Sequence, residues 1–142
     1  MRRRQNNGAV ILVVIVVVAY LYSHGPAAKH VTTSHLSAGA TTTSANTRLG
    51  QQMAASYGWT GSQWSCLDWL WTRESGWQMV WNTAGSGAYG IPQSLPASKM
   101  ASAGADYMTN PATQIKWGLG YIQGRYGTPC NAWAHETAAG WY

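Results

Sequence analysis

The sequence predicts an all-α domain spanning residues 48–142, preceded by a targeting segment and a linker. Helix start and stop signals recur from residue 48 onward, and the apolar residues between them repeat at helical spacing. One Gly-rich stretch, Thr83 to Gly90, interrupts these helices, and it is typical of a turn or a short β-ribbon. A compact helical domain of roughly 90 residues is near the lower range of independently stable sizes.

The targeting segment comprises residues 1–24. Three arginines, Arg2 to Arg4, precede an unbroken apolar run from Ala9 to Tyr22. This pattern is typical of a signal peptide or a short signal anchor, and it suits these residues better than a buried strand. The positive-inside tendency would leave the remainder of the chain outside the membrane. We therefore expect an extracellular or cell-surface protein that touches the membrane only through its N-terminal segment.

A flexible linker is predicted for residues 25–47, which are rich in Ser, Thr, Ala and Gly and show no periodicity. Asn46 or Thr47 would then cap the first helix, residues 48–57, and Gly58 would end it.

The second predicted helix spans residues 63–74, with Ser62 as its N-cap and Ser75-Gly76 at its end. Its buried face is expected to comprise Trp64, Leu67 and Trp71.

Three more helices are predicted after the Gly-rich stretch. The first is short, residues 98–103, and the next runs from Asn110-Pro111 to about Tyr126. Its inward-facing residues are expected to be Ile115, Leu119 and Ile122. Thr128-Pro129 repeats the start signal for the last helix, residues 130–139.

The charge pattern argues against nucleic acid as a partner. The net charge is +5, but the excess lies in the first third of the chain. From Leu49 onward four basic residues balance the four acids, which are Asp68, Glu74, Asp106 and Glu136. A near-neutral domain lacks the basic surface that nucleic-acid binding requires.

Cys66 and Cys130 are the only cysteines, and the sequence allows either a disulfide or two buried thiols. An even count in an exported chain favours the disulfide. Without clustered ligands, no metal site and no cofactor are expected; His135 has only Glu136 nearby.

Glu74 is the candidate catalytic residue. It is expected at the C-terminal end of a helix, where the helix dipole and apolar neighbours both disfavour a carboxylate and raise its pKa. A raised pKa would keep a proton available for general acid catalysis, whereas a surface Glu without a role is the competing interpretation. Trp77 and Tyr89 are expected to line a sugar-binding groove, whereas other rings of this region would fill the core. The polar groups of such a groove would come from Ser75, Asn82 and Gln93.

Three segments resemble soluble lytic transglycosylases of the lysozyme-like superfamily. They are Arg73-Glu74-Ser75-Gly76-Trp77, then Ser86-x-Ala88-Tyr89-Gly90-x-x-Gln93, then the helix from Asn110 to Ile122. The tail, from Trp133 to Tyr142, is similar to small exported actinobacterial members. Ala132-Trp133-Ala134-His135 departs from the Ala-Tyr-Asn-type motif that the family carries in its last helix.

The resemblance implies that Glu74 is the acid/base that cleaves the β-1,4 bond between N-acetylmuramic acid and N-acetylglucosamine in peptidoglycan. It also implies that Gln93 and Tyr121 lie in or near the groove, and that Gly90 permits close backbone approach. A single-acid scheme would form 1,6-anhydromuramic ends, whereas water as the acceptor would make the protein a muramidase. The sequence is also compatible with a non-catalytic wall-binding or adhesion module and with a structural envelope protein, and nothing demands more than a monomer.

Overall fold

The computed structural model describes residues 38–142, which form a mainly helical domain. The predicted targeting segment, residues 1–24, and the predicted linker up to residue 37 lie outside the described residues. The elements are α2 (Ala38–Ala55), α3 (Ser62–Ser75), the 3-10 helix η1 (Ala97–Ser102), α4 (Pro111–Tyr126) and α5 (Pro129–Ala139). The predicted all-α class is therefore confirmed, and residues 38–142 contain no β-strand.

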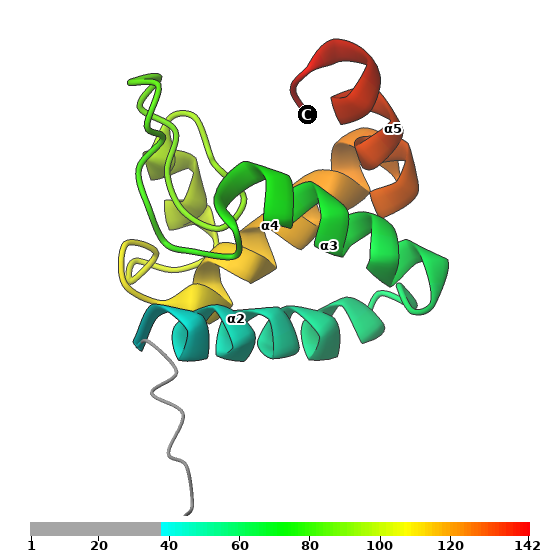
Figure 1. The fold of residues 1–142 in the computed structure, drawn as a ribbon, viewed down its shortest axis with the longest axis horizontal. Helices are drawn as coiled ribbons and strands as arrows, with labels where there is room; N and C mark the ends of the chain where they lie inside the picture. The colour runs from blue at the N-terminus through cyan, green and yellow to red at the C-terminus, as the bar shows by residue number, and fades with distance from the viewer. Residues whose placement is uncertain (1–37) are drawn as a thin grey trace, which may run out of the picture. The chain divides into compact units, whose positions relative to one another are not determined.

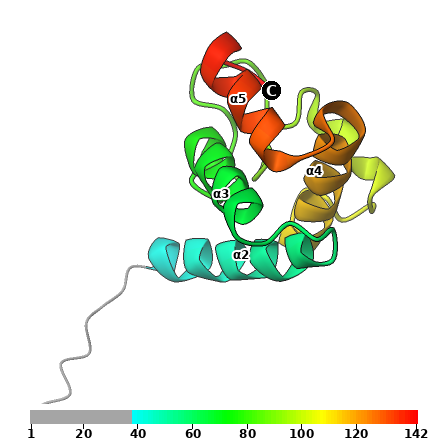
Figure 2. The ribbon, with the colours of Figure 1, turned by 90° about the vertical axis from the view of Figure 1, so that its right-hand side faces the viewer.

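The helices enclose one core. α2 runs along one side of the domain, with α3 and α4 lying across it and α5 on the far side (Figure 1 and Figure 2). α3 packs mainly against α5, and α4 contacts α2, α5 and η1. The irregular chain between α3 and α4 gathers at one end of the helices (Figure 1).

The predicted linker boundary at residue 47 was wrong, because α2 already begins at Ala38. Asn46 is not a helix cap: its side chain is 4% exposed, and its Nδ2 donates a hydrogen bond to the Trp77 carbonyl oxygen at 2.9 Å. A Ser/Thr/Ala-rich segment with weak amphipathicity therefore becomes helical through tertiary contacts, which its composition does not reveal.

α3 ends where the sequence predicts. Gly76 adopts a left-handed conformation (φ 61°), and its N–H donates to the Thr72 carbonyl oxygen. The Trp77 N–H donates to the carbonyl oxygen of Trp71. Glu74 therefore lies in the last turn of α3, immediately before the chain leaves the helix.

The predicted signals at α4 and α5 are confirmed. Asn110 Oδ1 accepts a hydrogen bond from the Ala112 N–H at 2.9 Å, and Thr128 Oγ1 accepts one from the Asn131 N–H at 3.3 Å. Both helices start at a proline, Pro111 and Pro129. The short helix predicted for residues 98–103 is η1, shifted by one residue.

The core lies between α3 and α4. The three residues of α4 predicted to face inward, Ile115, Leu119 and Ile122, are fully buried, as are Leu67 and Trp71 of α3. The indole of Trp71 extends from α3 to Gly118 of α4, where an added Cβ would lie 2.6 Å from Cζ2 of the ring. Gly118 therefore makes room for the indole of Trp71.

The Gly-rich stretch forms turns and two isolated bridges, Trp81 to Tyr89 and Tyr89 to Ser94, rather than a regular ribbon. Gln114 of α4 anchors the chain that follows: its buried Oε1 accepts a hydrogen bond from the Ile91 N–H at 2.9 Å. Ser75 Oγ donates to the Ile91 carbonyl oxygen, also at 2.9 Å. Residue 91 is thus tied to both α4 and the end of α3.

Cys66 of α3 and Cys130 of α5 form the predicted disulfide, with a sequence separation of 64 residues. Closing a loop of this length stabilises the folded state by about 4 kcal/mol in the chain-entropy model. Within the described residues, no helix has both the length and the apolar character needed to cross a membrane. The apolar run 9–22 lies outside that range.

Candidate active site

Glu74 lies in the wall of an open hollow next to the end of α3. The hollow has a volume of about 270 Å³. Its lining comes from α3, the Gly-rich stretch and the segment after α5, and comprises Glu74, Asn82, Ala88, Gln93, Leu95, Gly140, Trp141 and Tyr142. We call it the Glu74 hollow. Its walls bring together segments that are up to 68 positions apart in the chain, since they include both Glu74 and Tyr142.

The pKa of Glu74 is raised from its ordinary value to about 7. Partial burial is the largest cause, and the nearby carboxylate of Glu136 adds to it because a second negative charge disfavours ionisation, whereas the guanidinium of Arg73 opposes both effects. A substantial fraction of Glu74 therefore keeps its proton near neutral pH, as a general acid requires.

Glu136 is the second carboxylate of this region, but it does not line the hollow. Its side chain is almost fully buried, and its Oε1 lies 2.9 Å from Nε of Arg73. Its Oε2 is buried without a hydrogen-bond partner among the described residues. The sequence gives no direct signal for this neighbour, because Glu136 follows Glu74 by 62 positions and only the packing of α5 on α3 brings it close.

Tyr142 links the two sides of the hollow. Its hydroxyl accepts a hydrogen bond from Nε1 of the buried Trp71 at 2.8 Å and donates one to the Pro92 carbonyl oxygen at 2.9 Å. Burial, followed by the nearby Glu74 carboxylate, raises the pKa of Tyr142 well above its ordinary value. The phenol is therefore a neutral part of the wall. The sequence analysis did not predict that Tyr142 lines the hollow. The only signal for this role is that Tyr142 follows Gly140, the predicted end of the last helix, so that the chain can turn back there.

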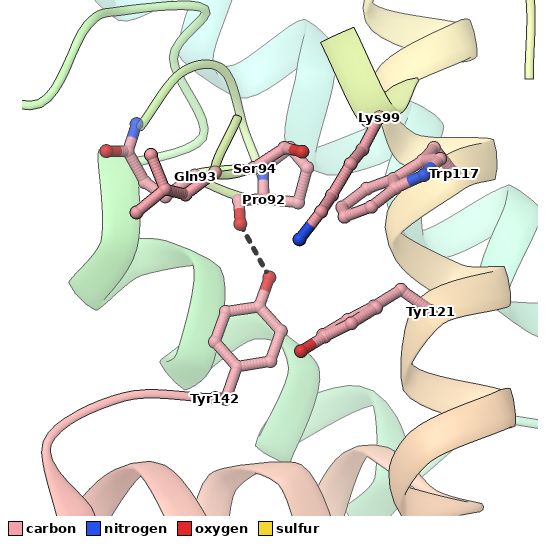
Figure 3. A pocket seen from close by; sticks show the side chains of 8 residues that line it. Pro92, Gln93, Ser94, Lys99, Trp117, Tyr121 and Tyr142 are labelled. Atoms are coloured by element: carbon pink, nitrogen blue, oxygen red, sulfur yellow. Dashed lines mark hydrogen bonds between the residues drawn. The ribbon is translucent and has the colours of Figure 1, made fainter. Parts of the chain in front are cut away.

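A smaller pocket of about 90 Å³ adjoins the Glu74 hollow (Figure 3). The two share Gln93, Leu95 and Tyr142 in their linings. The smaller pocket is completed by Pro92, Ser94, Lys99, Trp117 and Tyr121. We call it the Lys99 pocket. It places the predicted groove residue Tyr121 next to the hollow that holds Glu74.

A third hollow, of about 370 Å³, shares Trp117 and Tyr121 with the lining of the Lys99 pocket. Their rings stack with centroids 5.2 Å apart and planes inclined by 12°. The remaining lining residues are Tyr57, Ser102, Ala103, Lys116 and Gly120. Neighbouring hollows of the three thus share lining residues, and we refer to the three together as the groove, with Glu74 in the first hollow and Lys116 in the third.

Gln93 and Asn82 line the Glu74 hollow. Gln93 has a left-handed backbone (φ 49°), and its Nε2 donates to the carbonyl oxygens of Gly90 at 2.9 Å and Val80 at 3.1 Å. The side chain therefore also fixes the turn that carries it. Its Oε1 is buried and accepts no hydrogen bond within the described part of the chain.

Trp77 and Tyr89 were predicted as substrate contacts, but the structure places both in the core. Trp77 is 2% exposed, and its Nε1 donates to Oδ1 of Asp68 at 2.8 Å. Tyr89 is 7% exposed, and its hydroxyl donates to the Met108 carbonyl oxygen at 2.8 Å. Neither ring lines any of the three hollows.

Ser75 and Gly90 also have structural contacts in place of the predicted substrate contacts. Ser75 Oγ holds the backbone of Ile91 at the end of α3. Gly90 has φ 85°, and an added Cβ would meet the buried side chain of Gln114. The close backbone approach expected at Gly90 is therefore an approach to the protein's own α4.

Within residues 38–142, no three His, Cys, Asp or Glu side chains gather where a metal ion would be held. The groove instead offers one partly buried carboxyl, several aromatic rings and the ammonium groups of Lys99 and Lys116. This combination of a proton donor, aromatic rings and cationic groups suits acid catalysis on an extended ligand that has both apolar faces and polar groups.

Comparison with protein-family models, with curated proteins and with solved structures found no match for this chain.

Proposed function

We propose that this protein is an exported enzyme that cleaves the β-1,4 glycosidic bond between N-acetylmuramic acid and N-acetylglucosamine in peptidoglycan, with Glu74 as its single acid/base. The observation that carries the proposal is the position of Glu74 in the groove wall with a pKa of about 7. A saccharide suits the groove, because sugars present apolar C–H faces to aromatic rings and hydroxyls to amides such as Gln93. The resemblance to lytic transglycosylases and the lysozyme-like fold it implies agree with this assignment.

In the first step, protonated Glu74 donates its proton to the glycosidic oxygen as the bond to the muramic anomeric carbon breaks. The N-acetyl group of the substrate supports the resulting oxocarbenium ion. The Glu74 carboxylate then takes the proton of the sugar's own 6-hydroxyl, whose oxygen bonds to the anomeric carbon. The product carries a 1,6-anhydro ring, and Glu74 regains its proton.

The single-acid scheme is supported by the groove lining. Glycosidases with two catalytic carboxylates place them about 5–10 Å apart on either side of the bond. Among the described residues that line the three hollows, Glu74 is the only one with a carboxyl side chain. Glu136 is close enough to affect the pKa of Glu74, but it is buried and paired with Arg73. We therefore favour transglycosylation over hydrolysis.

An exported location is part of the proposal. A disulfide such as Cys66–Cys130 is typical of proteins that fold in oxidising compartments. Peptidoglycan lies outside the membrane, where the predicted targeting segment would deliver the domain. We propose that the protein acts there as a monomer, because nothing in its sequence demands a second copy.

The test compares Glu74→Gln with the full-length parent on purified peptidoglycan, with mass spectrometry of the released fragments. Glutamine keeps the shape of the side chain but cannot donate a catalytic proton, so we expect fragment release to fall by about 10²–10⁴-fold. Parent fragments should be lighter by one water than muramidase products. Asp68→Asn is the matched control: it removes a carboxylate from the same helix, and its remaining oxygen can still accept from Trp77 Nε1.

The outcomes separate the competing functions. Equal fragment release by Glu74→Gln and the parent would disprove the role of Glu74. Fragments of the full hydrolytic mass would make the protein a muramidase. If the parent binds peptidoglycan but releases no fragments, the protein is a wall-binding module. If it neither binds nor releases fragments, a structural role is favoured.

A further inference from the structure

We propose that the Lys99 pocket binds a carboxylate carried by the glycan chain in the groove. This inference rests on the proposed function, because it concerns the ligand that occupies the same groove. It identifies the ligand more closely, as a saccharide with an acidic substituent beside the bond that Glu74 cleaves.

Among residues 38–142, the ammonium group of Lys99 has no ion-pair partner. Lys99 is exposed on η1, and the only ion pair among residues 38–142 joins Arg73 to Glu136. Asp68 accepts from Trp77, and Asp106 accepts from Asn110 and Thr113. Within the described chain, therefore, no side-chain carboxylate other than that of Glu74 lies in the groove with this ammonium group.

The hydrogen-bond donors of the pocket converge. Figure 3 shows the ammonium group of Lys99 and the hydroxyls of Tyr121 and Tyr142 pointing into the same space. The Tyr142 hydroxyl already donates its proton to the Pro92 carbonyl oxygen. The donors that remain for a ligand are the Lys99 ammonium and the Tyr121 hydroxyl. A site with a cationic donor and a neutral donor suits an anionic oxygen acceptor.

The size of the pocket favours a substituent as its ligand. Its volume of about 90 Å³ is the smallest of the three hollows. A carboxylate with the carbons that attach it suits this space better than a whole sugar ring. Sugar rings would occupy the larger hollows on either side, of about 270 and 370 Å³.

In peptidoglycan the carboxylate has two possible sources. One is the lactyl group of N-acetylmuramic acid, which is free where the peptide has been removed. The other is the peptide stem, whose own carboxylates extend from the amidated lactyl group. Both present the same chemistry to Lys99, so the experiment has to distinguish them.

The experiment measures binding by calorimetry to the full-length Glu74→Gln protein, which leaves the ligand uncleaved. Three ligands are compared: glycan strands freed of peptides, the same strands with their lactyl carboxylates converted to methylamides, and strands that retain their peptides. Lys99→Met and Lys99→Arg are introduced into the Glu74→Gln protein. Arg48→Met is the matched control, because Arg48 is an exposed cation of α2 that lines none of the hollows.

We expect Lys99→Met to weaken binding of the peptide-free acidic strands by about tenfold, at the lower end of the range for a hydrogen bond to a charged group. Binding of the methylamide strands should not change. Lys99→Arg should restore much of the affinity, Arg48→Met should have little effect, and added salt should reduce the difference between acidic and neutral strands. A loss on the peptide-bearing strands as well would identify the stem as a source.

Equal effects of Lys99→Met on all three ligands, including no effect on any of them, would overturn this inference, whereas a loss of affinity confined to the peptide-bearing strands would assign the carboxylate to the stem. If the parent cleaves peptidoglycan but Lys99→Met weakens binding of all strands equally or of none, only the carboxylate site is disproved. If Lys99→Met selectively weakens binding of the strands that carry carboxylates but the parent cleaves nothing, only the proposed enzymatic function is disproved. An absence of binding to all three ligands would overturn both.

Discussion

At the scale of single residues, the environment of Glu74 is a balance of opposing effects on its charge. Partial burial and the carboxylate of Glu136 both favour the protonated form. Arg73 favours the ionised form, but its Nε is engaged by Glu136 at 2.9 Å. The balance raises the pKa to about 7, so the proton is present when the leaving oxygen needs it.

The same pKa shift predicts a pH dependence of stability. Glu74 has a pKa of about 7 in the folded state and an ordinary value near 4.5 when unfolded. The folded protein therefore binds the proton more tightly. The resulting stabilisation is complete below about pH 4.5 and is lost as the pH rises through 7. Glutamine at position 74 has no charge to bury, so Glu74→Gln should become more stable than the parent as the pH increases.

We expect the difference in unfolding free energy between Glu74→Gln and the parent to grow by about 1–2 kcal/mol from pH 5 to pH 8. This range is reduced for solvent screening, because Glu74 is only partly buried. Urea unfolding at several pH values measures the difference, with Asp68→Asn as the matched control. A constant difference across this range would contradict the raised pKa.

At this scale the sequence predicted the direction of the pKa shift but not all of its causes. The location of Glu74 at a helix end among apolar residues is a local pattern, and burial is indeed the largest cause. Glu136 contributes through tertiary packing, which has no local signal. The same reason explains the errors at Trp77 and Tyr89. An aromatic residue near a catalytic carboxyl is equally compatible with a groove or a core, and only the fold decides between them.

At the scale of elements, α3 and α4 are held together through one indole ring. Trp71 of α3 is fully buried, fits against Gly118 of α4 and donates a hydrogen bond to Tyr142. The spacing between these two helices thus determines where the Tyr142 phenol lies. Packing in the core and the shape of the groove wall are therefore linked.

Two glycines of α4 test this link. Gly118→Ala should destabilise the domain by about 1–3 kcal/mol, because its Cβ would overlap the ring of Trp71. Gly124→Ala should stabilise it by about 0.5–1 kcal/mol, because an added Cβ there meets nothing within 4 Å and alanine favours helix. Thermal and urea unfolding measure both changes. Equal effects of the two substitutions would show that the contact with Trp71 does not limit the packing.

The boundaries of α4 and α5 could be predicted because their signals are local. Asn110 and Thr128 cap the helices, prolines begin them, and Gly127 and Gly140 end them. The start of α2 could not, because its Ser/Thr-rich sequence has low helix propensity and only weak amphipathicity. Its first half is held by contacts such as that of Asn46 with Trp77, 31 positions away.

At the scale of the whole molecule, the domain is larger than the sequence predicts. Residues 38–47 belong to it as the first part of α2, and Asn46 among them bonds to the backbone of the buried Trp77. Gly50, one turn after Asn46, lies against the ring of the same tryptophan. α2 is thus an integral part of the structure that holds the end of α3 in place.

This boundary can be tested with two fragments. A fragment of residues 38–142 should unfold at nearly the same urea concentration as the full-length protein. A fragment of residues 48–142 should be less stable by at least about 1–3 kcal/mol, because the buried carbonyl oxygen of Trp77 loses its donor. Asn46→Ala in the full-length protein separates the hydrogen bond from the rest of the segment. Equal stability of the two fragments would show that residues 38–47 do not stabilise the domain, as the linker prediction requires.

The contact between Tyr142 and Pro92 joins two positions 50 residues apart in the chain. The side of the cleft that needs both residues is complete only when the segment after α5 has docked beside residue 92. A folding intermediate in which this segment is still free would contain Glu74 but lack part of the cleft around it. Docking of this segment is the folding step that completes the surroundings of the carboxyl.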